Sequence, residues 1–223
     1  MRLRGVDTVL FDMDGTLSSS EGLALDAAVN GLERFYGEIG EREPIPSREA
    51  IRAMIGLPSA VYFAKLVPPR LESRWEDVRR HVLALELEYL AAGRGGMFAG
   101  TAEVLGRLME KGLRLGLVTN AGRGYFRATC DALGLDPFFS VALCIDDAPG
   151  GTKADLVRRA AAGLGTRSGA MVGDKSYDME AGRANGFLTV GCTWGYGLPG
   201  EFDGADAVID DIRHLPGLLG LDP

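Results

Sequence analysis

Two aspartates, Asp12 and Asp14, lie two positions apart where an apolar run near the N-terminus ends. The run Val9–Phe11 is rich in residues that favour strands, and Gly15 follows the second acid. Side chains alternate across a strand, so both carboxylates leave the strand end on the same side. Two like charges held this close are unfavourable unless a cation, a shared proton or a reaction uses them. The pair therefore indicates chemistry at this strand end.

A second acidic pair follows another short apolar run, Met171–Gly173. Asp174 comes directly after this run, and Asp178 lies four residues later, near the start of a predicted helix. On its own, Asp178 could merely complement the positive end of that helix. Carboxylate oxygens at a strand end are also the hard ligands that Mg²⁺ prefers. The second pair is therefore a candidate metal site.

Two further positions supply groups that could bind an anion. Thr119 and Asn120 close an apolar run, which by itself is ordinary entry into a loop. Lys153 begins a predicted helix, with Thr152 and Asp155 suggesting a cap around it. A lysine in the first turn opposes the helix dipole at a cost of a few tenths to about 1 kcal/mol. Either a solvated lysine tolerates this cost, or an anionic partner offsets it.

Taken in their order along the chain, the four segments resemble the four motifs of the haloacid dehalogenase superfamily, most of whose members are phosphohydrolases that act through an aspartyl-phosphate. The resemblance implies that Asp12 is the nucleophile. Asp14 would protonate the leaving oxygen and then deprotonate the water that hydrolyses the intermediate. By the same resemblance, Thr119, Asn120 and Lys153 bind the substrate. Thr119 and Lys153 would also act in catalysis, on the phosphoryl group.

The resemblance also implies Mg²⁺ as the cofactor. The side chains of Asp12 and Asp174 and the main-chain carbonyl of Asp14 would bind the ion, and Asp178 would act behind these ligands or through a water. Mg²⁺ keeps several waters and bridges carboxylates to phosphate. This arrangement would place the cation between the protein and the phosphoryl group.

The segment Thr193–Gly197 further resembles the phosphoglycolate phosphatase-like branch of the superfamily, although a Trp and a Tyr there could equally be ordinary packing. Three features depart from the usual pattern. Ala154 follows Lys153 where the family often has proline, and Ser19 stands where those relatives usually carry an acid. Residues Ala121–Arg123 replace their common basic run. The first departure weakens the match to the family's third motif without removing it, and the other two bear on the branch.

Short apolar runs alternate with helical stretches through most of the chain, which predicts a parallel sheet with helices on both faces. The expected strands are Thr8–Phe11, Leu113–Val118, Val141–Ile145, Ala170–Gly173, Leu188–Cys192 and Ala207–Ile209. The expected helices are Thr101–Lys111 with Thr101 as its N-cap, Tyr125–Leu133, Lys153–Gly163, Ser176–Asn185 and Ile212–Leu219. The predicted fold class is α/β, with a doubly wound, Rossmann-like core.

One long section, residues 20–94, breaks this alternation and shows only helical periodicity. Its expected helices are Glu21–Tyr36, Ser47–Ile55, Ser59–Leu66 and Ser73–Ala92, the last with Ser73 and Glu76 as a capping box. The prediction is an α/β hydrolase core made of residues 1–19 and 95–223, with residues 20–94 inserted as an α-helical cap domain.

The inserted cap is expected to close over the site and to pivot on Ser18–Ser20 and Gly93–Gly96. Glycine adopts backbone conformations that other residues resist, which suits a return hinge. Ile55–Pro58 and Lys65 are the candidates for the cap residues that select the substrate. Specificity itself depends on contacts that spacing along a chain does not place.

Composition limits the partners and the compartment. The net charge of −7 argues against a protein that wraps nucleic acid, because such binding relies on Lys and Arg to neutralise phosphates. No apolar stretch is long enough for a signal peptide or a membrane span. Three scattered cysteines suit a reducing compartment better than disulfides. The expectation is a cytoplasmic protein, monomeric or homodimeric, without a nucleic-acid or membrane partner.

The sequence therefore predicts a Mg²⁺-dependent phosphatase that hydrolyses a small phosphate monoester, such as phosphoglycolate, a nucleotide or a sugar phosphate. A phosphomutase remains an alternative, because it would use the same two aspartates and differ only in shielding the intermediate from water. A 2-haloacid dehalogenase is disfavoured by Asp14, since displacing halide from carbon needs no acid there and no metal. A non-catalytic binding module is disfavoured because all four motif positions are kept.

Overall fold

The centre of the protein is a parallel sheet, seen in a computed structural model that describes residue 3, residues 5–198 and residues 200–221. Its six strands have the order β3-β2-β1-β4-β5-β6. They are β1 (Thr8–Phe11), β2 (Arg114–Thr119), β3 (Val141–Cys144), β4 (Ala170–Gly173), β5 (Leu188–Cys192) and β6 (Ala207–Ile209). Because β2 and β4 flank β1, the chain order reverses at β1, as in doubly wound folds. The predicted fold class is confirmed.

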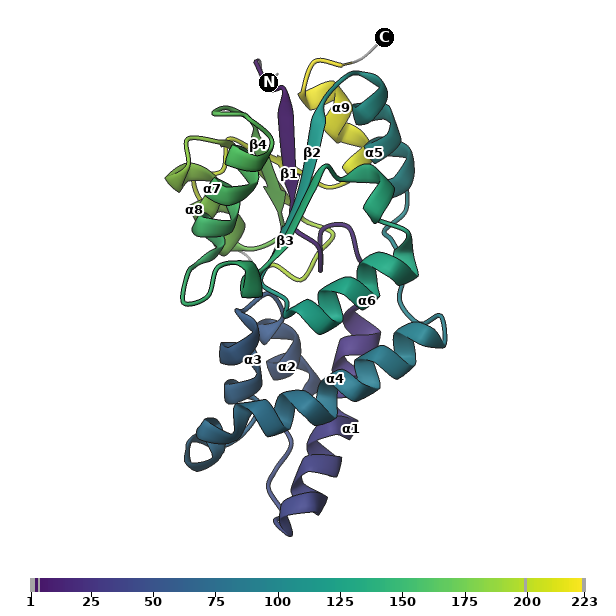
Figure 1. Ribbon diagram of the computed structural model, residues 1–223, viewed down its shortest axis with the longest axis vertical. Coiled ribbons are helices and arrows are strands. Elements are labelled where there is room, and N and C mark those ends of the chain that lie inside the picture. The colour runs from purple at the N-terminus through teal and green to yellow at the C-terminus, as the bar shows by residue number, and fades with distance from the viewer. Residues whose placement is uncertain (1–2, 4, 199, 222–223) are drawn as a thin grey trace.

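Helices cover both faces of this sheet (Figure 1). One face carries α7 (Lys153–Gly163) and α8 (Ser176–Ala184), and the other carries α5 (Thr101–Glu110) and α9 (Leu215–Leu218). Neighbouring residues of β1 therefore enter different cores: Leu10 packs with the α7 side, whereas Val9 and Phe11 pack with the α5 side. Burial on both faces explains why the strands read as continuous apolar runs.

Two helix predictions in the core are corrected. Thr101 is not the N-cap of α5 but its first residue, because Gly100 precedes it in a left-handed conformation with φ of 85°. The expected helix Ile212–Leu219 is divided into a 3₁₀ turn, Ile212–His214, and the short α9. Pro216 lies in the first turn of α9, where its missing N–H costs nothing, and this divides the segment.

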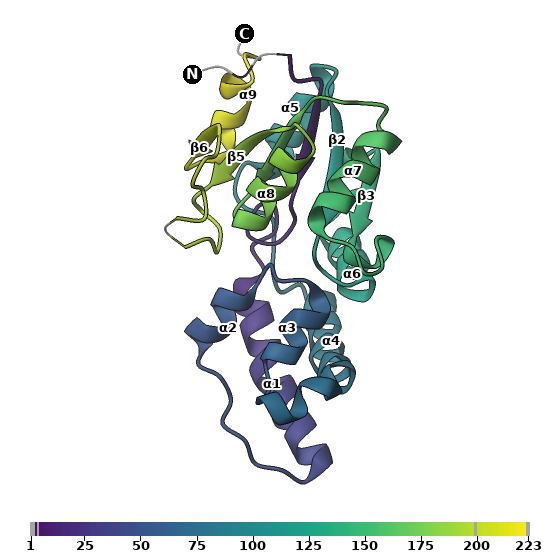
Figure 2. The same ribbon diagram turned by 90° about the vertical axis from the view of Figure 1, so that its left-hand side faces the viewer.

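A separate group of helices lies beyond the carboxyl ends of the strands (Figures 1 and 2). It comprises α1 (Glu21–Ile39), α2 (Arg48–Met54), α3 (Ser59–Lys65), a 3₁₀ helix (Pro69–Arg74) and α4 (Trp75–Ala91). These helices enclose an apolar cluster of their own, which includes Leu32, Phe35, Ile51, Val82 and Leu85. Among the described residues, no helix is both long and apolar enough to cross a membrane.

The crossing of α1 and α4 is close because of a glycine. A Cβ atom on Gly31 would lie 2.7 Å from Cγ2 of Val82, a distance that real Cβ contacts do not show.

The expected capping box at the start of α4 is wrong. The Pro68–Pro69 pair starts a 3₁₀ helix that runs directly into α4, so Ser73 already lies within a helical turn and Arg74 precedes the helix without a side-chain cap.

The chain enters and leaves this helical group through adjacent residues. The Ser19 amide donates to the carbonyl oxygen of Gly96 at 2.7 Å, and the Phe98 amide donates to that of Leu17 at 2.9 Å. Ser18 and Met97 form an isolated antiparallel bridge between the two connections. The division into a core and a cap that moves at these connections stays a prediction.

Candidate active site

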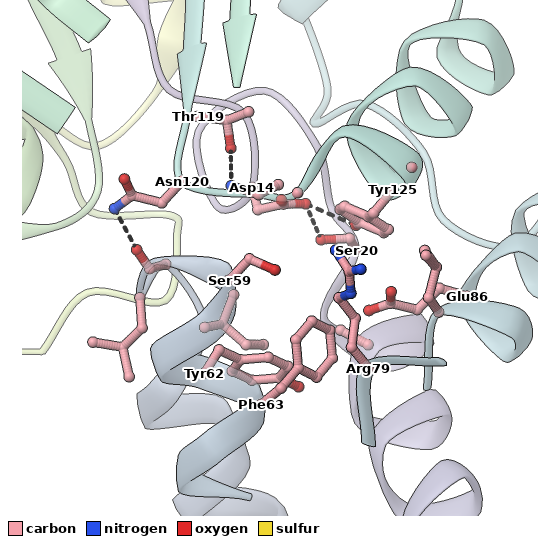
Figure 3. Close-up of a pocket in the computed structure, with 18 of the residues that line it drawn as sticks. Asp14, Ser20, Ser59, Tyr62, Phe63, Arg79, Glu86, Thr119, Asn120 and Tyr125 are labelled. Atoms are coloured by element: carbon pink, nitrogen blue, oxygen red, sulfur yellow. Dashed lines mark hydrogen bonds between the residues drawn. The ribbon is translucent and has the colours of Figure 1, made fainter. Parts of the chain in front are cut away.

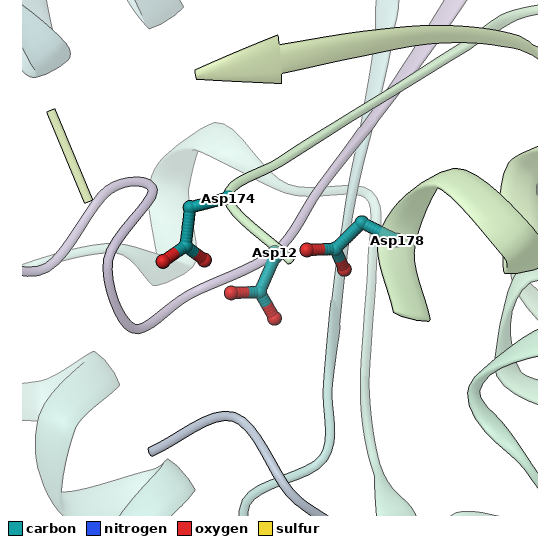
Figure 4. Close-up of side chains that lie close together, drawn as sticks. All are labelled: Asp12, Asp174 and Asp178. Carbon is teal, nitrogen blue, oxygen red and sulfur yellow. The ribbon is translucent and has the colours of Figure 1, made fainter. Parts of the chain in front are cut away.

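Three carboxylates meet where β1 and β4 end (Figure 4). Asp12 follows β1, Asp174 follows β4, and Asp178 is the third residue of α8. One oxygen of each lies within 4.8 Å of the others, and all three residues are buried. Burial raises the pKa of Asp12 well above its usual range, as do the charges of Asp178 and Asp174, while Lys153 opposes the shift. This cluster requires positive charge.

Lys153 supplies part of that charge. Its Nζ atom forms an ion pair with Oδ1 of Asp12 and lies 2.6 Å from Oδ1 of Asp178. Burial alone would lower the pKa of this lysine, but the two carboxylates raise it, so the ammonium form persists. Thr152 and Asp155 form the expected capping box at the start of α7 and thereby fix the position of Lys153.

Asp174 is held by the loop after β5. The Tyr196 amide donates to its Oδ2 at 2.7 Å, whereas its Oδ1 is buried and has no hydrogen-bond partner among the residues that the structure describes. The same loop is tied to the residues after β1, since Trp194 Nε1 donates to the Thr16 carbonyl at 3.0 Å. The hydroxyl of Tyr196 accepts from the Ser20 amide at 2.8 Å. The aromatic residues of this segment therefore position the site as well as packing against the core.

Asp14 points away from the three acids toward a polar pair. Its Oδ1 accepts from Ser20 Oγ at 2.6 Å and from the Tyr125 hydroxyl at 2.9 Å (Figure 3). Burial raises the pKa of Asp14, and the two hydroxyl donors oppose this shift. Asp12 and Asp14 thus lie in different surroundings although they are only two residues apart, which suits them to different roles.

Thr119 and Asn120 lie at the end of β2, on the opposite side of β1 from Asp174. The Thr119 oxygen accepts from the Ala121 amide at 3.1 Å, which leaves its hydroxyl hydrogen available to a phosphoryl oxygen. Asn120 Nδ2 donates instead to the Gly56 carbonyl at 2.9 Å, and the Asn120 carbonyl accepts from the Ser59 amide at 3.1 Å. Asn120 thus joins the core to the helical group.

A pocket lies between Asp12, Asp14 and Thr119 on one side and the helical group on the other (Figure 3). Its distal wall is mainly apolar and comes from the loop after α2 and from α3 and α4: Ile55, Gly56, Leu57, Ser59, Tyr62, Phe63, Arg79, Leu83 and Glu86. The expected inner loop therefore does line the pocket. Lys65 does not line it and is exposed at the last turn of α3, so its selection was wrong.

The acidic cluster has the donor set that Mg²⁺ prefers. The buried Oδ1 of Asp174 needs a partner, and a cation held between Asp12 and Asp174 would supply it. Asp178 is engaged elsewhere, because its Oδ2 accepts from the Lys175 amide at 3.0 Å and its Oδ1 faces Lys153. Asp12 and Asp174 could therefore bind the ion directly, with Asp178 supporting Lys153.

Tyr125, Ser20 and Glu86 were not predicted as site residues. Tyr125 lies one turn into α6 (Arg123–Leu133), and Ser20 lies immediately before α1, so their convergence on Asp14 depends on the fold. Glu86 carries one signal along the chain: with Arg79 and Leu83 it follows the spacing of one helix face, beside the buried Val82 and Leu85.

Comparison with known proteins identifies the family. Residues 6–186 match the model of the haloacid dehalogenase-like hydrolases. The chain is 30% identical to the pyrophosphatase PpaX of Halalkalibacterium halodurans, over 97% of this chain and 96% of the relative. It is 29% identical to a phosphoglycolate phosphatase of Pseudomonas savastanoi pv. phaseolicola, over 96% of this chain and 80% of the relative.

Solved structures share the fold. The crystal structure of a predicted phosphoglycolate phosphatase from Haemophilus somnus 129pt superposes with a TM-score of 0.83 at 21% identity, over 96% of this chain and 97% of that chain. The chain belongs to the haloacid dehalogenase-like hydrolases. The predicted family, its phosphoglycolate phosphatase-like branch and the enzyme class, a phosphatase, are confirmed.

Proposed function

We propose that this protein is a Mg²⁺-dependent phosphatase that hydrolyses a small phosphate monoester through an aspartyl-phosphate on Asp12. The observation that carries the proposal is the pairing of Lys153 with both Asp12 and Asp178 beside the partnerless oxygen of Asp174. This arrangement supports the proposal, because a carboxylate and fixed positive charge lie together at one strand end, next to a pocket. Bound Mg²⁺ would neutralise charge between the carboxylates and the phosphoryl oxygens.

The first step forms a bond between an Asp12 oxygen and phosphorus and breaks the bond from phosphorus to the leaving oxygen. Lys153 orients Asp12 and offsets the negative charge of the phosphoryl group, and the Thr119 hydroxyl donates to a phosphoryl oxygen. Asp14 gives its proton to the leaving oxygen. The raised pKa of its buried carboxyl supports this role, because the acid must hold a proton before the step.

The second step hydrolyses the aspartyl-phosphate. A water attacks phosphorus, the bond to Asp12 breaks, and Asp14 accepts the proton of that water, which returns both residues to their initial states. Ser20 and Tyr125 hold the Asp14 carboxyl in place throughout, since both donate to its Oδ1. A phosphomutase would perform the first step in the same way and would then return the phosphoryl group to the bound product.

The experiment is release of inorganic phosphate from p-nitrophenyl phosphate, with and without Mg²⁺ and with excess chelator. We expect turnover only with the metal, and [³²P]phosphate trapped on the protein after acid quench. Turnover that persists in chelator would contradict the proposed cofactor. With a sugar phosphate added to the labelled protein, transfer of the phosphoryl group to a sugar hydroxyl in place of release to water would favour the phosphomutase.

A further inference from the structure

One face of α4 presents an acidic residue, Glu86, to the pocket. Arg79, Leu83 and Glu86, spaced four and three residues apart, line the pocket together. In Figure 3 the Glu86 carboxyl points toward the centre of the pocket. Only 6% of this residue is exposed. Among the described residues, its carboxyl has neither a hydrogen-bond donor nor an ion-pair partner.

A carboxyl buried in this way is expensive to keep ionised. Burial raises the pKa of Glu86 to about 8, and the negative charge of Asp14 contributes to the shift. Arg79 does not relieve it, because the Arg79 guanidinium packs over the Trp75 ring with 5.5 Å between its Cζ and the ring centre. At neutral pH Glu86 is therefore mainly a carboxylic acid, which both donates and accepts hydrogen bonds.

A second polar group faces the pocket from the opposite side. Ser59 is the first residue of α3, and Figure 3 shows its hydroxyl directed into the pocket across from Glu86. Between them the wall is apolar, with Leu57, Phe63 and Leu83 lining it. The distal wall thus offers Glu86 and Ser59 as separated hydrogen-bonding groups on a mainly apolar surface, with Arg79 on the same helix face as Glu86.

We propose that Glu86 and Ser59 bind hydroxyl groups of an uncharged polyol leaving group, and that the natural substrate is a polyol or sugar phosphate. This inference rests on the proposed phosphatase function. A leaving group with a carboxylate or a second phosphate would lose its water at this apolar wall without gaining an ion pair, because the Arg79 guanidinium packs over the Trp75 ring. Phosphoglycolate and pyrophosphate should therefore be poor substrates, although relatives carry these names.

The test measures kcat/KM for four esters and one anhydride: glycerol 3-phosphate, phosphoglycolate, phosphoethanolamine, p-nitrophenyl phosphate and pyrophosphate. We expect glycerol 3-phosphate to exceed the two anionic compounds and phosphoethanolamine by about tenfold or more, the worth of one or two ligand hydrogen bonds. p-Nitrophenyl phosphate tests the chemistry alone, because its leaving group has no hydroxyl for Glu86. If the parent protein does not hydrolyse it, the proposed function fails; if it does and shows no polyol preference, only this inference fails.

Variants assign the preference to Glu86. In Glu86→Leu the ratio of kcat/KM for glycerol 3-phosphate to that for p-nitrophenyl phosphate should fall about tenfold. Glu86→Gln, which keeps a donor and an acceptor, should retain most of the ratio. The matched control is Glu88→Leu, an exposed glutamate on the same helix, which should leave the ratio unchanged.

Two results would overturn the inference. A preference for phosphoglycolate that is lost in Arg79→Met would show that Arg79 selects an anionic leaving group. A preference for phosphoethanolamine would assign Glu86 to an ammonium group. If Glu86→Leu does not fold, the ratio in Glu86→Gln and Ser59→Ala decides, since Ser59→Ala removes the opposite partner and should lower the ratio by itself.

Discussion

The side-chain nitrogen of Asn120 donates a 2.9 Å hydrogen bond to the carbonyl oxygen of Gly56, and so joins the end of β2 to the loop between α2 and α3. The main-chain carbonyl of Asn120 accepts from the Ser59 amide in the same contact. Arg52 adds a third link, since its Nη2 donates to the Gly195 carbonyl at 3.3 Å. These bonds hold the helical group against the core over the pocket.

Asn120→Asp should weaken this contact, because a carboxylate oxygen would face the Gly56 carbonyl in place of a donor. We expect KM for p-nitrophenyl phosphate to rise about three- to tenfold, the worth of one hydrogen bond, with faster proteolysis in residues 55–58. The main-chain bond to Ser59 remains and limits the effect. An unchanged KM and an unchanged proteolysis pattern would show that the Asn120 side chain does not hold the helical group against the core.

Asp12 and Asp14, the two aspartates with proposed catalytic roles, should respond differently to the same substitution. Asp12→Asn should abolish turnover, because an amide oxygen is a poor nucleophile toward phosphorus. Asp14→Asn should still bind substrate but lose the proton transfers, which slows both steps by about 10²–10⁴-fold. Steady-state rates and acid-quench labelling distinguish the two. Near-native activity in Asp12→Asn would exclude the covalent mechanism.

Metal binding should be detectable without turnover. Mg²⁺ at millimolar concentration should raise the midpoint of thermal unfolding of the parent protein, since a ligand that binds only the folded state stabilises it. Asp174→Asn should reduce this rise, because it removes a charge and a ligand at the partnerless oxygen. Glu88→Gln is the control for a general charge effect. Equal rises in both variants would place the cation elsewhere.

Glu86 should make stability depend on pH. Its pKa is about 8 in the folded protein and near 4.3 in an unfolded chain, so the folded state binds the extra proton between these values. The free energy of unfolding should therefore fall as pH rises through this window, with a contribution of about 1.4 kcal/mol per unit from this group. Glu86→Gln should remove that slope and be the more stable protein at pH 8.

The other titratable groups near Glu86 affect the pH dependence of stability differently. Burial raises the pKa of Tyr62 and of Tyr125 beyond their usual range, so both phenols stay neutral throughout. Asp14 contributes a slope of the same sign, because its pKa is also raised, and this part should survive in Glu86→Gln. Urea unfolding at pH 5.5 and pH 8 measures the difference between the two proteins. Parallel slopes would mean that the Glu86 carboxyl is solvated.

The return connection should tolerate change at one glycine and not at its neighbour. Gly95 has φ of 86°, where a Cβ is strained, whereas Gly96 has φ outside this region and open space around it. Gly95→Ala should therefore alter kcat and KM together if this segment is the pivot, and Gly96→Ala should change neither. Unchanged kcat and KM in both variants would show that the helical group does not pivot at this connection.

The strands were largely predictable because their chemistry is local. Thr8–Phe11 lies between Asp7 and Asp12, Leu188–Cys192 follows a turn at Gly186 and ends before Thr193, and the structure reproduces the expected bounds of both strands. The same holds for the acids at strand ends, since parallel strands bring their carboxyl ends to one edge. Ser73 shows the limit: its sequence context fits a cap, but the 3₁₀ helix begun by the prolines before it determines where α4 starts.

The pocket wall could not be predicted in the same way. Glu86 is buried because α4 crosses α1 closely at Gly31 and faces the strand ends, and neither condition is local in the chain. Tyr125 reaches Asp14 across 111 positions for a similar reason. Lys65, the other candidate for selecting the substrate, lies in the last turn of α3, where it is exposed to solvent. The positions of side chains between the core and the helical group depend on how these two parts pack against each other.

The bridge between Ser18 and Met97 has a consequence for how such a protein can evolve. Since the chain departs and returns at one point, the segment in between can lengthen, shorten or be exchanged without displacing β1 and β2 from their register. Mutations that change the substrate preference can then accumulate in one stretch of the gene, while the residues at the strand ends stay unchanged. Exchange of this one segment is then a route to a new substrate.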